Sequence, residues 1–133
     1  DACEMFMPAA RLGLHFYRGG LERYVTRLGL DVAKRLFLTA ERIDAAEMKS
    51  IGFLTHLVAA EALDEAVRGL TGSVCALAPL AVQGMKLHLN RIARGTLDAD
   101  ALARDIARSI QSTDLQEGRA AFAEKRTPRF RGV

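Results

Sequence analysis

From residue 63 to about residue 125, apolar residues recur at helical spacing in four successive segments of the chain. Offsets of three and four place such residues on one face of a helix. Pro79 suits the first turn of the second segment, and Gly95 closes it. Asp114 and Glu117 give the fourth segment the spacing of a capping box. Helices with faces this apolar usually pack on something outside themselves. The predicted helices are 63–75, 79–94, 98–110 and 112–125, and the residues expected to face inward are Leu63, Ala66, Val67, Leu70, Val74, Ala81, Met85, Leu89, Ile92, Leu102, Ile106 and Ile110.

The segment before these helices predicts a smaller part that mixes helices with one strand. Asp31 is placed to cap a helix, and Asp44 with Glu47 has the capping-box spacing. The run FLTHLV, Phe53 to Val58 with His56 inside it, is short, apolar and β-branched enough for a buried strand. The helices predicted in this part are 21–28, 31–40 and 44–51.

Composition and charge narrow the class of protein. The chain has 133 residues, half of them apolar and a quarter charged, which is typical of one soluble globular domain. A net charge of +3 suits an anionic small molecule and falls short of a nucleic-acid-binding signature. Cys3 and Cys75 lack the spacing of a disulfide framework or a zinc site, so we expect reduced thiols and a cytoplasmic protein. No run reaches the roughly 18 apolar residues of a membrane span, and His88 has no second metal ligand at an offset of three or four.

The stretch MPAARLGLHFYRGG, Met7 to Gly20, combines a proline, a Leu-Gly pair and two adjacent glycines with no carboxylate. Between these residues stand His15, Phe16 and Tyr17. The pair Gly19-Gly20 could cradle a phosphate, but it has no following lysine and no fingerprint spacing. A turn into the next helix with close backbone packing is the preferred interpretation. The stretch is therefore either a connecting loop or the wall of an active site that lacks its usual acid.

Four strings along the chain carry a further signal: MPAARLGL, GGLERYVTRLG, AKRLFLTAERIDAAEMKSIGFLTHLV and STDLQEGRAAFAEKRTPRF. Their order resembles the crotonase family, the enoyl-CoA hydratases and isomerases. That family has Pro-Glu, Leu-Gly and Gly-Gly before an Arg-bearing helix, and ends in Ser-x-Asp-x-x-Glu-Gly followed by Ala-Phe-x-Glu-Lys-Arg-x-Pro-x-Phe. The resemblance covers only the C-terminal half of such a protein. It implies a mostly α fold with a small α/β remnant, in which the end of a ββα spiral core precedes a helical oligomerisation region.

The resemblance also implies a chemistry. Family members bind an acyl-CoA thioester with its carbonyl oxygen between two backbone N–H groups, which stabilise an enolate. One such donor is worth about 3–4 kcal/mol. By resemblance, both donors and the first of two catalytic glutamates belong to segments upstream of Asp1, so we expect the isolated chain to be inactive. The second glutamate would follow Pro8, where this sequence has Ala9, whose methyl group cannot transfer a proton.

Other residues of this stretch could replace the missing acid. Family members with other chemistries carry their acid or hydrogen-bonding residue in the loop after Leu-Gly, which makes Tyr17 and His15 the catalytic candidates here. Packing or lining the acyl pocket is the alternative role for both. An aromatic residue in this loop also resembles the decarboxylating members of the family. The residues expected to line the substrate pocket are Pro8, Ala9, Leu12, Gly13, Phe16 and Gly20.

The basic C-terminal tail has two interpretations. Taken without the family, it is a solvated charged segment. By resemblance, Phe122 and Lys125 match residues that approach the coenzyme A of a neighbouring subunit, the lysine near phosphate. The partners implied are an acyl-CoA thioester and further copies of the chain, as a trimer or a dimer of trimers. No metal and no cofactor beyond the coenzyme A of the substrate is implied.

We therefore expect residues 1–58 to form the end of the spiral core and residues 59–133 the helical, CoA-facing region. The expected function is that of an enoyl-CoA hydratase or isomerase. Two alternatives stay open: a crotonase-family decarboxylase, and a non-catalytic homologue that binds acyl-CoA or oligomerises. A basic helical module for nucleic acid rests only on the tail and the charge of +3, and it is disfavoured.

Overall fold

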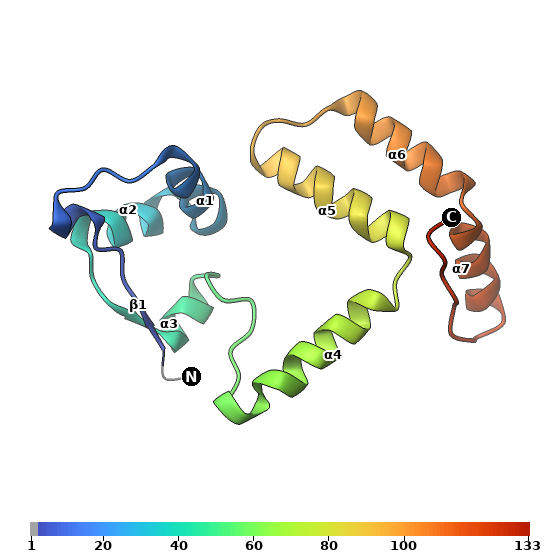
Figure 1. The fold of residues 1–133 in the computed structure, drawn as a ribbon, viewed down its shortest axis with the longest axis horizontal. Helices are drawn as coiled ribbons and strands as arrows, with labels where there is room; N and C mark the ends of the chain where they lie inside the picture. The colour runs from blue at the N-terminus through green and yellow to red at the C-terminus, as the bar shows by residue number, and fades with distance from the viewer. Residues whose placement is uncertain (1–2) are drawn as a thin grey trace. The chain divides into compact units, whose positions relative to one another are not determined.

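The computed structural model describes residues 3–133, which form helices and one two-stranded sheet (Figure 1). The chain divides into two compact units, one ending at Leu63 and one running from Asp64 to Val133. The mostly helical fold with a small strand-bearing part agrees with the expected fold class. The functional division into 1–58 and 59–133 stays a prediction.

The first unit is built on a short antiparallel strand pair and three α-helices. In the sheet, Glu4 pairs with Asp44 and Met5 with Ile43. The carboxylate of Asp44 accepts a hydrogen bond from the Glu47 backbone N–H at 2.8 Å, which confirms the predicted cap. The elements are β1 (Glu4–Met5), η1 (Ala9–Leu12), α1 (Arg18–Leu28), α2 (Leu30–Thr39), β2 (Ile43–Asp44), α3 (Ala45–Ser50) and η2 (Ala60–Ala62).

The core of the first unit gathers around Leu36, whose side chain is 0% exposed. Ile43, Ala45 and Met48 are buried with it, so β2 and α3 close over α2. Partly buried apolar residues from α1 and from the chain after α3 complete the cluster: Met5, Tyr24, Leu28, Val32, Ile51, Phe53, Leu54 and Leu57.

The predicted strand at 53–58 is wrong, because this segment has no regular structure. Side chains, rather than a neighbouring strand, donate hydrogen bonds to two of its carbonyl groups. Arg27 donates to the Phe53 carbonyl at 3.2 Å, and the Lys49 ammonium donates to the Thr55 carbonyl. His56, expected inside the strand, is exposed. A short apolar run carries too little periodicity to separate a strand from an apolar loop.

The second unit holds the four predicted helices in order (Figure 1). Helix α5 packs against α6, and α6 contacts α7. Pro79 opens α5 as predicted, and the Asp98 carboxylate caps α6 by accepting from the Ala101 N–H at 2.8 Å. That hydrogen bond also lowers the pKa of Asp98. The helices are α4 (Leu63–Cys75), α5 (Pro79–Ala93), α6 (Ala99–Gln111) and α7 (Thr113–Ala123).

The predictions for the N-terminal ends of α1, α2 and α7 differ from the structure. Helix α1 begins at Arg18 and includes both glycines in its first turn. Asp31 lies in the first turn of α2, whose N-cap is Gly29, so the predicted aspartate cap is wrong. Asp114 does not cap α7 either. Ser112 does, accepting from the Leu115 N–H at 3.2 Å, because it stands one position before the helix.

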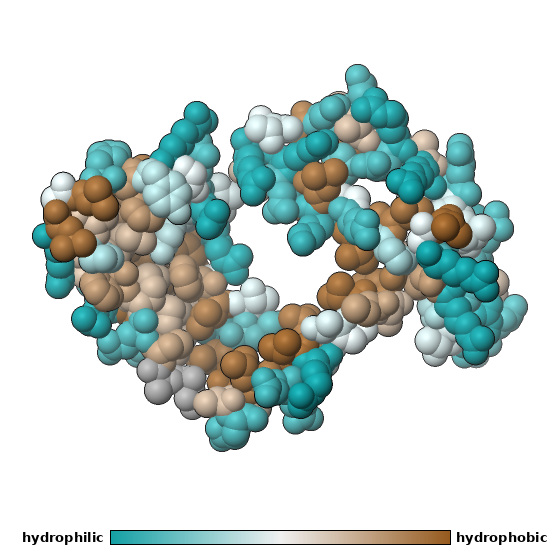
Figure 2. All heavy atoms as spheres, viewed as in Figure 1, coloured by the Kyte–Doolittle hydropathy of each residue, from teal (hydrophilic) through white to brown (hydrophobic). Residues whose placement is uncertain are grey.

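Most residues of α4, α5 and α6 that were expected to face inward are exposed within this chain, whereas Ala66, Ala81 and Leu102 are partly buried. No residue of α4 is buried, and brown apolar side chains follow this helix at the surface (Figure 2). Exposed residues at helical spacing are Leu63, Val67, Leu70, Val74, Met85, Leu89, Ile92, Ile106 and Ile110.

Within residues 3–133, no single helix has the length and apolar composition needed to cross a membrane. Residues 60–75 and α5 reach that length and composition only as a bent pair.

The core of the first unit predicts an asymmetry between two leucines of α2. Replacing Leu36 by Ala removes a fully buried side chain and should lower the free energy of unfolding by about 2–5 kcal/mol. Leu38 on the same helix is 75% exposed, and Leu38→Ala should change it by less than about 0.5 kcal/mol. Urea unfolding followed by circular dichroism measures both, and equal effects would contradict the described core.

Candidate functional site

The stretch from Pro8 to Gly13 is a single turn of 3₁₀ helix that ends at a left-handed glycine. Gly13 has φ +68°, and its N–H donates to the carbonyls of the preceding turn. The methyl group of Ala9 is buried, whereas Leu12 and Gly13 are exposed. The position that would carry the second glutamate therefore points into the first unit and offers no proton-transfer group.

The catalytic candidates stand on an aromatic loop between η1 and α1. The Phe16 ring lies 4.6 Å from Tyr17 and 5.1 Å from Phe37 between ring centroids. Tyr17 is 62% exposed in this chain. The His15 ring nitrogen Nδ1 lies 2.9 Å from the Phe16 carbonyl oxygen, a hydrogen bond that requires the Nδ1–H tautomer.

The aromatic cluster continues inward from this loop. Tyr24 meets Phe37 edge-on with 4.9 Å between centroids, and lies 6.1 Å from Phe53. Burial raises the pKa of the Tyr24 hydroxyl, which stays protonated at neutral pH. The loop that holds His15 and Tyr17 is thus anchored through Phe16 to the core of the first unit.

Gly20 is buried because the Phe16 ring occupies the space a side chain would need. A Cβ built on Gly20 would overlap the Phe16 ring and come within 3.1 Å of Tyr17. Gly19, its neighbour, has only Tyr17 at 3.9 Å. The interpretation of this pair as a site of close backbone packing is supported at Gly20, and the aromatic loop sits on the first turn of α1.

The second unit holds the candidates for coenzyme A binding at the end of α7. Phe122 is 88% exposed and lines a cavity of about 460 Å³ together with Leu80, Leu115 and Phe130. Lys125 follows the helix with φ +54°. The predicted end at Lys125 is therefore two residues late, since α7 ends at Ala123.

Lys125 occupies a position where helices usually place glycine. Its N–H donates to the Phe122 carbonyl at 3.3 Å, and the next N–H, of Arg126, donates to the Ala121 carbonyl at 3.0 Å. These two bonds make a Schellman motif with Lys125 at the left-handed residue. A side chain in that conformation costs of order 1–3 kcal/mol, and it persists only where the surroundings hold it.

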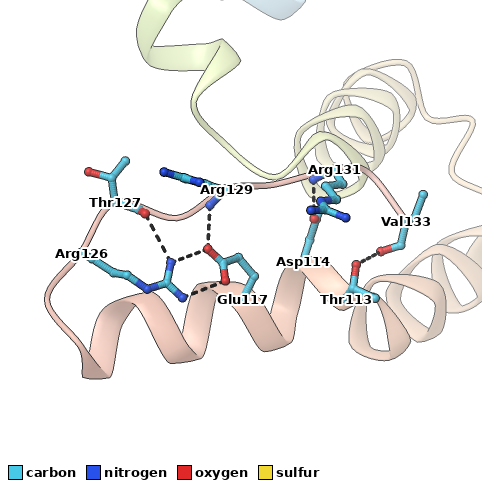
Figure 3. A pocket seen from close by; sticks show the side chains of 8 residues that line it. All are labelled: Thr113, Asp114, Glu117, Arg126, Thr127, Arg129, Arg131 and Val133. Carbon is cyan, nitrogen blue, oxygen red and sulfur yellow. Dashed lines mark hydrogen bonds and ion pairs between the residues drawn. The ribbon is translucent and has the colours of Figure 1, made fainter.

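The chain after this turn lies along α7 and is held there by Glu117 (Figure 3). The Arg126 guanidinium donates two parallel hydrogen bonds to the Glu117 carboxylate, at 2.6 and 2.9 Å, and a third to Glu124 at 2.5 Å. The Arg129 backbone N–H donates to the same Glu117 at 2.8 Å. These hydrogen bonds lower the pKa of Glu117 to about 2 and raise the pKa of Arg126. Glu117 is therefore ionised at any ordinary pH.

Asp114 holds the end of the same segment. Its carboxylate is 3% exposed and accepts from the backbone N–H groups of Arg131, at 2.7 Å, and Gly132, at 2.8 Å. Beside it, Thr113 donates from both its N–H and its hydroxyl to the Val133 carbonyl oxygen, each at 2.9 Å. We call residues 126–133 the tail strap. The strap and α7 border a cavity of about 980 Å³ (Figure 3).

A buried histidine of α5 pairs with an aspartate of α6. His88 Nε2 lies 2.8 Å from Asp105 Oδ2, and the other ring nitrogen of His88 is buried with no hydrogen-bond partner among residues 3–133. Sequence spacing within one helix could not reveal this pair, since the two residues stand 17 positions apart.

The thiols and possible metal ligands form no site in the described part of the chain. Cys3 and Cys75 are both free and exposed. Among residues 3–133, no three His, Cys, Asp or Glu side chains come together in a way that could hold a metal ion.

Comparison with known proteins identifies the family. The family model described as enoyl-CoA hydratase/isomerase matches residues 1–133. The chain belongs to this family. Methylmalonyl-CoA decarboxylase of Escherichia coli is 31% identical over 130 residues, covering 95% of this chain and 50% of the relative. Enoyl-CoA hydratase domain-containing protein 2, mitochondrial, of Bos taurus is 33% identical over 120 residues, covering 86% of this chain and 40% of the relative.

A solved crotonase-family structure has the same fold. The crystal structure of enoyl-CoA hydratase from Mycobacterium tuberculosis is 28% identical and superposes with a TM-score of 0.84, covering 99% of this chain and 53% of that one. The chain spans about half the length of the relatives and structures that it matches.

The structure brings some predicted site residues together and leaves others apart. Phe16, Tyr17 and Gly20 form one packed group, with His15 beside it. Phe122 and Lys125 lie on the last turn of α7 and just after it, in the other unit. Sequence analysis missed the strap anchors Asp114 and Glu117, which it interpreted as a capping box. Two signals could have found them: Ser112 stands closer to the helix start than either residue, and a basic segment follows the helix.

The packing at Gly20 predicts opposite effects at two adjacent glycines. Gly20→Ala places a methyl group against the Phe16 ring and should lower the free energy of unfolding by about 1–3 kcal/mol. Gly19→Ala makes only an ordinary van der Waals contact with Tyr17, at 3.9 Å, and removes a helical glycine, so it should raise the free energy of unfolding by up to about 1 kcal/mol. Thermal unfolding of both variants measures the difference. Equal melting temperatures would show that Phe16 does not occupy the described position.

Proposed function

We propose that this chain is part of an enzyme that acts on an acyl-CoA thioester through a stabilised enolate. The observation that carries the proposal is the family match over residues 1–133. The aromatic loop at Phe16 and Tyr17 would form one wall of the acyl pocket, with Pro8, Ala9, Leu12, Gly13 and Gly20 beneath or beside it. In this proposal no cofactor is needed beyond the coenzyme A of the substrate.

Ala9 decides which reactions of the family suit this chain. Addition of water to an enoyl-CoA needs one group to activate the water and deliver its proton. The buried methyl group of Ala9 can do neither. Tyr17 or His15 would have to replace it, and both stand on the loop directly after η1. Beside the first glutamate that the family resemblance implies, hydration therefore depends on one of these two side chains as the second proton-transfer group.

Decarboxylation is the second candidate, and it is favoured by the same alanine. When a carboxylate on the carbon next to the thioester carbonyl leaves as CO₂, the electron pair of the broken C–C bond forms the enolate directly. No general base is required, and a proton from water then adds at the carbon that lost the carboxylate. A donor such as the hydroxyl of the exposed residue Tyr17 could hydrogen-bond the departing carboxylate. The similarity to a methylmalonyl-CoA decarboxylase supports this alternative.

The end of α7 is the proposed contact for coenzyme A. The exposed Phe122 ring offers a flat apolar face beside a cavity, and Lys125 offers a point charge to phosphate. In the proposal these residues serve the coenzyme A of a neighbouring copy of the chain. The assembly would be a homo-oligomer, a trimer or a dimer of trimers.

The exposed apolar faces support an assembled state. The α4 residues Leu63, Val67, Leu70 and Val74 are spaced by four, three and four, the pattern of a helix-packing seam, and all are exposed. Contiguous exposed apolar surface of this kind typically marks an interaction site.

An assay with matched substrates separates the candidate activities. We expect the 133-residue chain alone to give no turnover, and the longest polypeptide of the same reading frame to release CO₂ from a 2-carboxyacyl-CoA faster than it hydrates a trans-2-enoyl-CoA. Tyr17→Phe should lower decarboxylation by about tenfold or more, the loss of one hydrogen bond to a charged group. Hydration at the rates of ordinary hydratases would rule out the role given to Ala9. Binding of acyl-CoA without any turnover would favour a non-catalytic homologue.

Sedimentation velocity tests the assembly. We expect the chain to sediment as a species larger than its 14.5 kDa monomer. Leu70→Glu, on the apolar face of α4, should shift it toward the monomer, because a charge cannot be buried unpaired in an interface. Gly72→Glu adds the same charge on the opposite face of α4, where a Cβ meets nothing within 4 Å, and should leave the mass unchanged. A monomer at micromolar concentration would contradict the proposed homo-oligomer.

A further inference from the structure

The tail strap is tied to α7 at two separate places, and one of them adjoins Lys125. Asp114 binds the far end, at Arg131 and Gly132. Glu117 binds the near end through the Arg126 side chain and the Arg129 backbone. The left-handed turn at Lys125 immediately precedes the near end.

Glu117 makes contacts on both sides of a short loop. One carboxylate oxygen, Oε1, accepts from Arg126 Nη1 at 2.6 Å and from the Arg129 N–H at 2.8 Å, and the other accepts from Arg126 Nη2 at 2.9 Å. Residues 126 and 129 are thereby drawn to one point on α7. The chain between α7 and this point has only Glu124 and Lys125 in which to reverse direction, and Lys125 takes the left-handed conformation. The clamp and the left-handed conformation therefore depend on each other.

We propose that Glu117 is a positioning residue, which holds Lys125 in its left-handed turn and so presents the Lys125 ammonium to the phosphate groups of coenzyme A. This rests on the proposed function in one respect, the contact of Lys125 with coenzyme A. The clamp itself stands on the contacts of Glu117 alone. Without Glu117, the near end of the strap loses its anchor, and Lys125 relaxes toward the conformations that lysine prefers.

Net charge and positioning predict opposite effects of removing Glu117 on the affinity for coenzyme A. Removing Glu117 raises the net positive charge next to Lys125, which by long-range attraction alone would strengthen the binding of an anion. A positioning role predicts the reverse, a weaker binding. Glu124 offers a matched control. Its carboxylate accepts from Arg126 Nε at 2.5 Å, so removing it changes the net charge at this place by the same amount, and the contacts of Glu117 stay in place.

The structural arm of the test uses amide hydrogen exchange on the 133-residue chain. Glu117→Ala should speed exchange of the Arg129 amide by about tenfold or more, the loss of a charge-assisted hydrogen bond. The amides of Arg131 and Gly132, held by Asp114, should keep their protection, and the Cα chemical shift of Lys125 should leave its left-handed value. Glu124→Ala should do none of this. An unchanged Arg129 amide, or an unchanged Lys125 shift, overturns the proposal.

The binding arm uses coenzyme A itself in calorimetric titrations. Glu117→Ala and Lys125→Gly should each weaken binding by about two- to fivefold, the value of one exposed ion pair. The double variant should lose no more than Lys125→Gly alone, since Glu117 acts through Lys125. Additive losses, or tighter binding by Glu117→Ala, overturn the positioning role. If Lys125→Gly binds coenzyme A as the parent does, the proposed phosphate contact is wrong, while the exchange results still decide whether Glu117 holds the turn.

Discussion

The two units of this structure differ in how much of their apolar surface they bury. The first unit closes a core around Leu36, but the second leaves most of the apolar residues of α4, α5 and α6 exposed. Helix formation in water draws most of its stability from packing an apolar face. Helices α4 to α6 therefore carry the composition of packed helices without the partner surface, which is consistent with a chain that spans about half the length of its crotonase relatives.

Most of the second unit could be predicted from sequence, because its signals are local. Pro79, Asp98 and the helical spacing of apolar residues fixed the order and ends of α4 to α6 within about two residues. The failures came where two local signals compete. Asp114 and Glu117 have capping-box spacing, yet Ser112 stands closer to the helix start and caps it. At 53–58 an apolar run favoured a strand, but no neighbouring strand exists to pair with it in the described chain.

In the candidate site too, local motifs could be predicted from sequence and contacts between distant residues could not. The loop with His15 and Tyr17, and Ala9 at the position of the family's second glutamate, can be proposed from sequence, since each is visible in a motif; their roles stay predictions. It could not reveal that Phe16 fills the space above Gly20, because that packing depends on the approach of α2 through Phe37. Contacts between residues far apart in sequence, such as His88 with Asp105, are likewise invisible to periodicity.

The anchors of the tail strap bind main-chain groups at three of its residues. Glu117 and Asp114 accept from the N–H groups of Arg129, Arg131 and Gly132, so the path of the strap depends little on the side chains found there. Of these three residues, only Gly132 has a backbone conformation that restricts its identity: its φ is +76°, and a Cβ at this position would meet Pro79 at 3.5 Å. Mutations can therefore accumulate at positions 129 and 131 without displacing the backbone, which leaves both free to diverge between homologues and to adjust the surface charge of this end of the molecule.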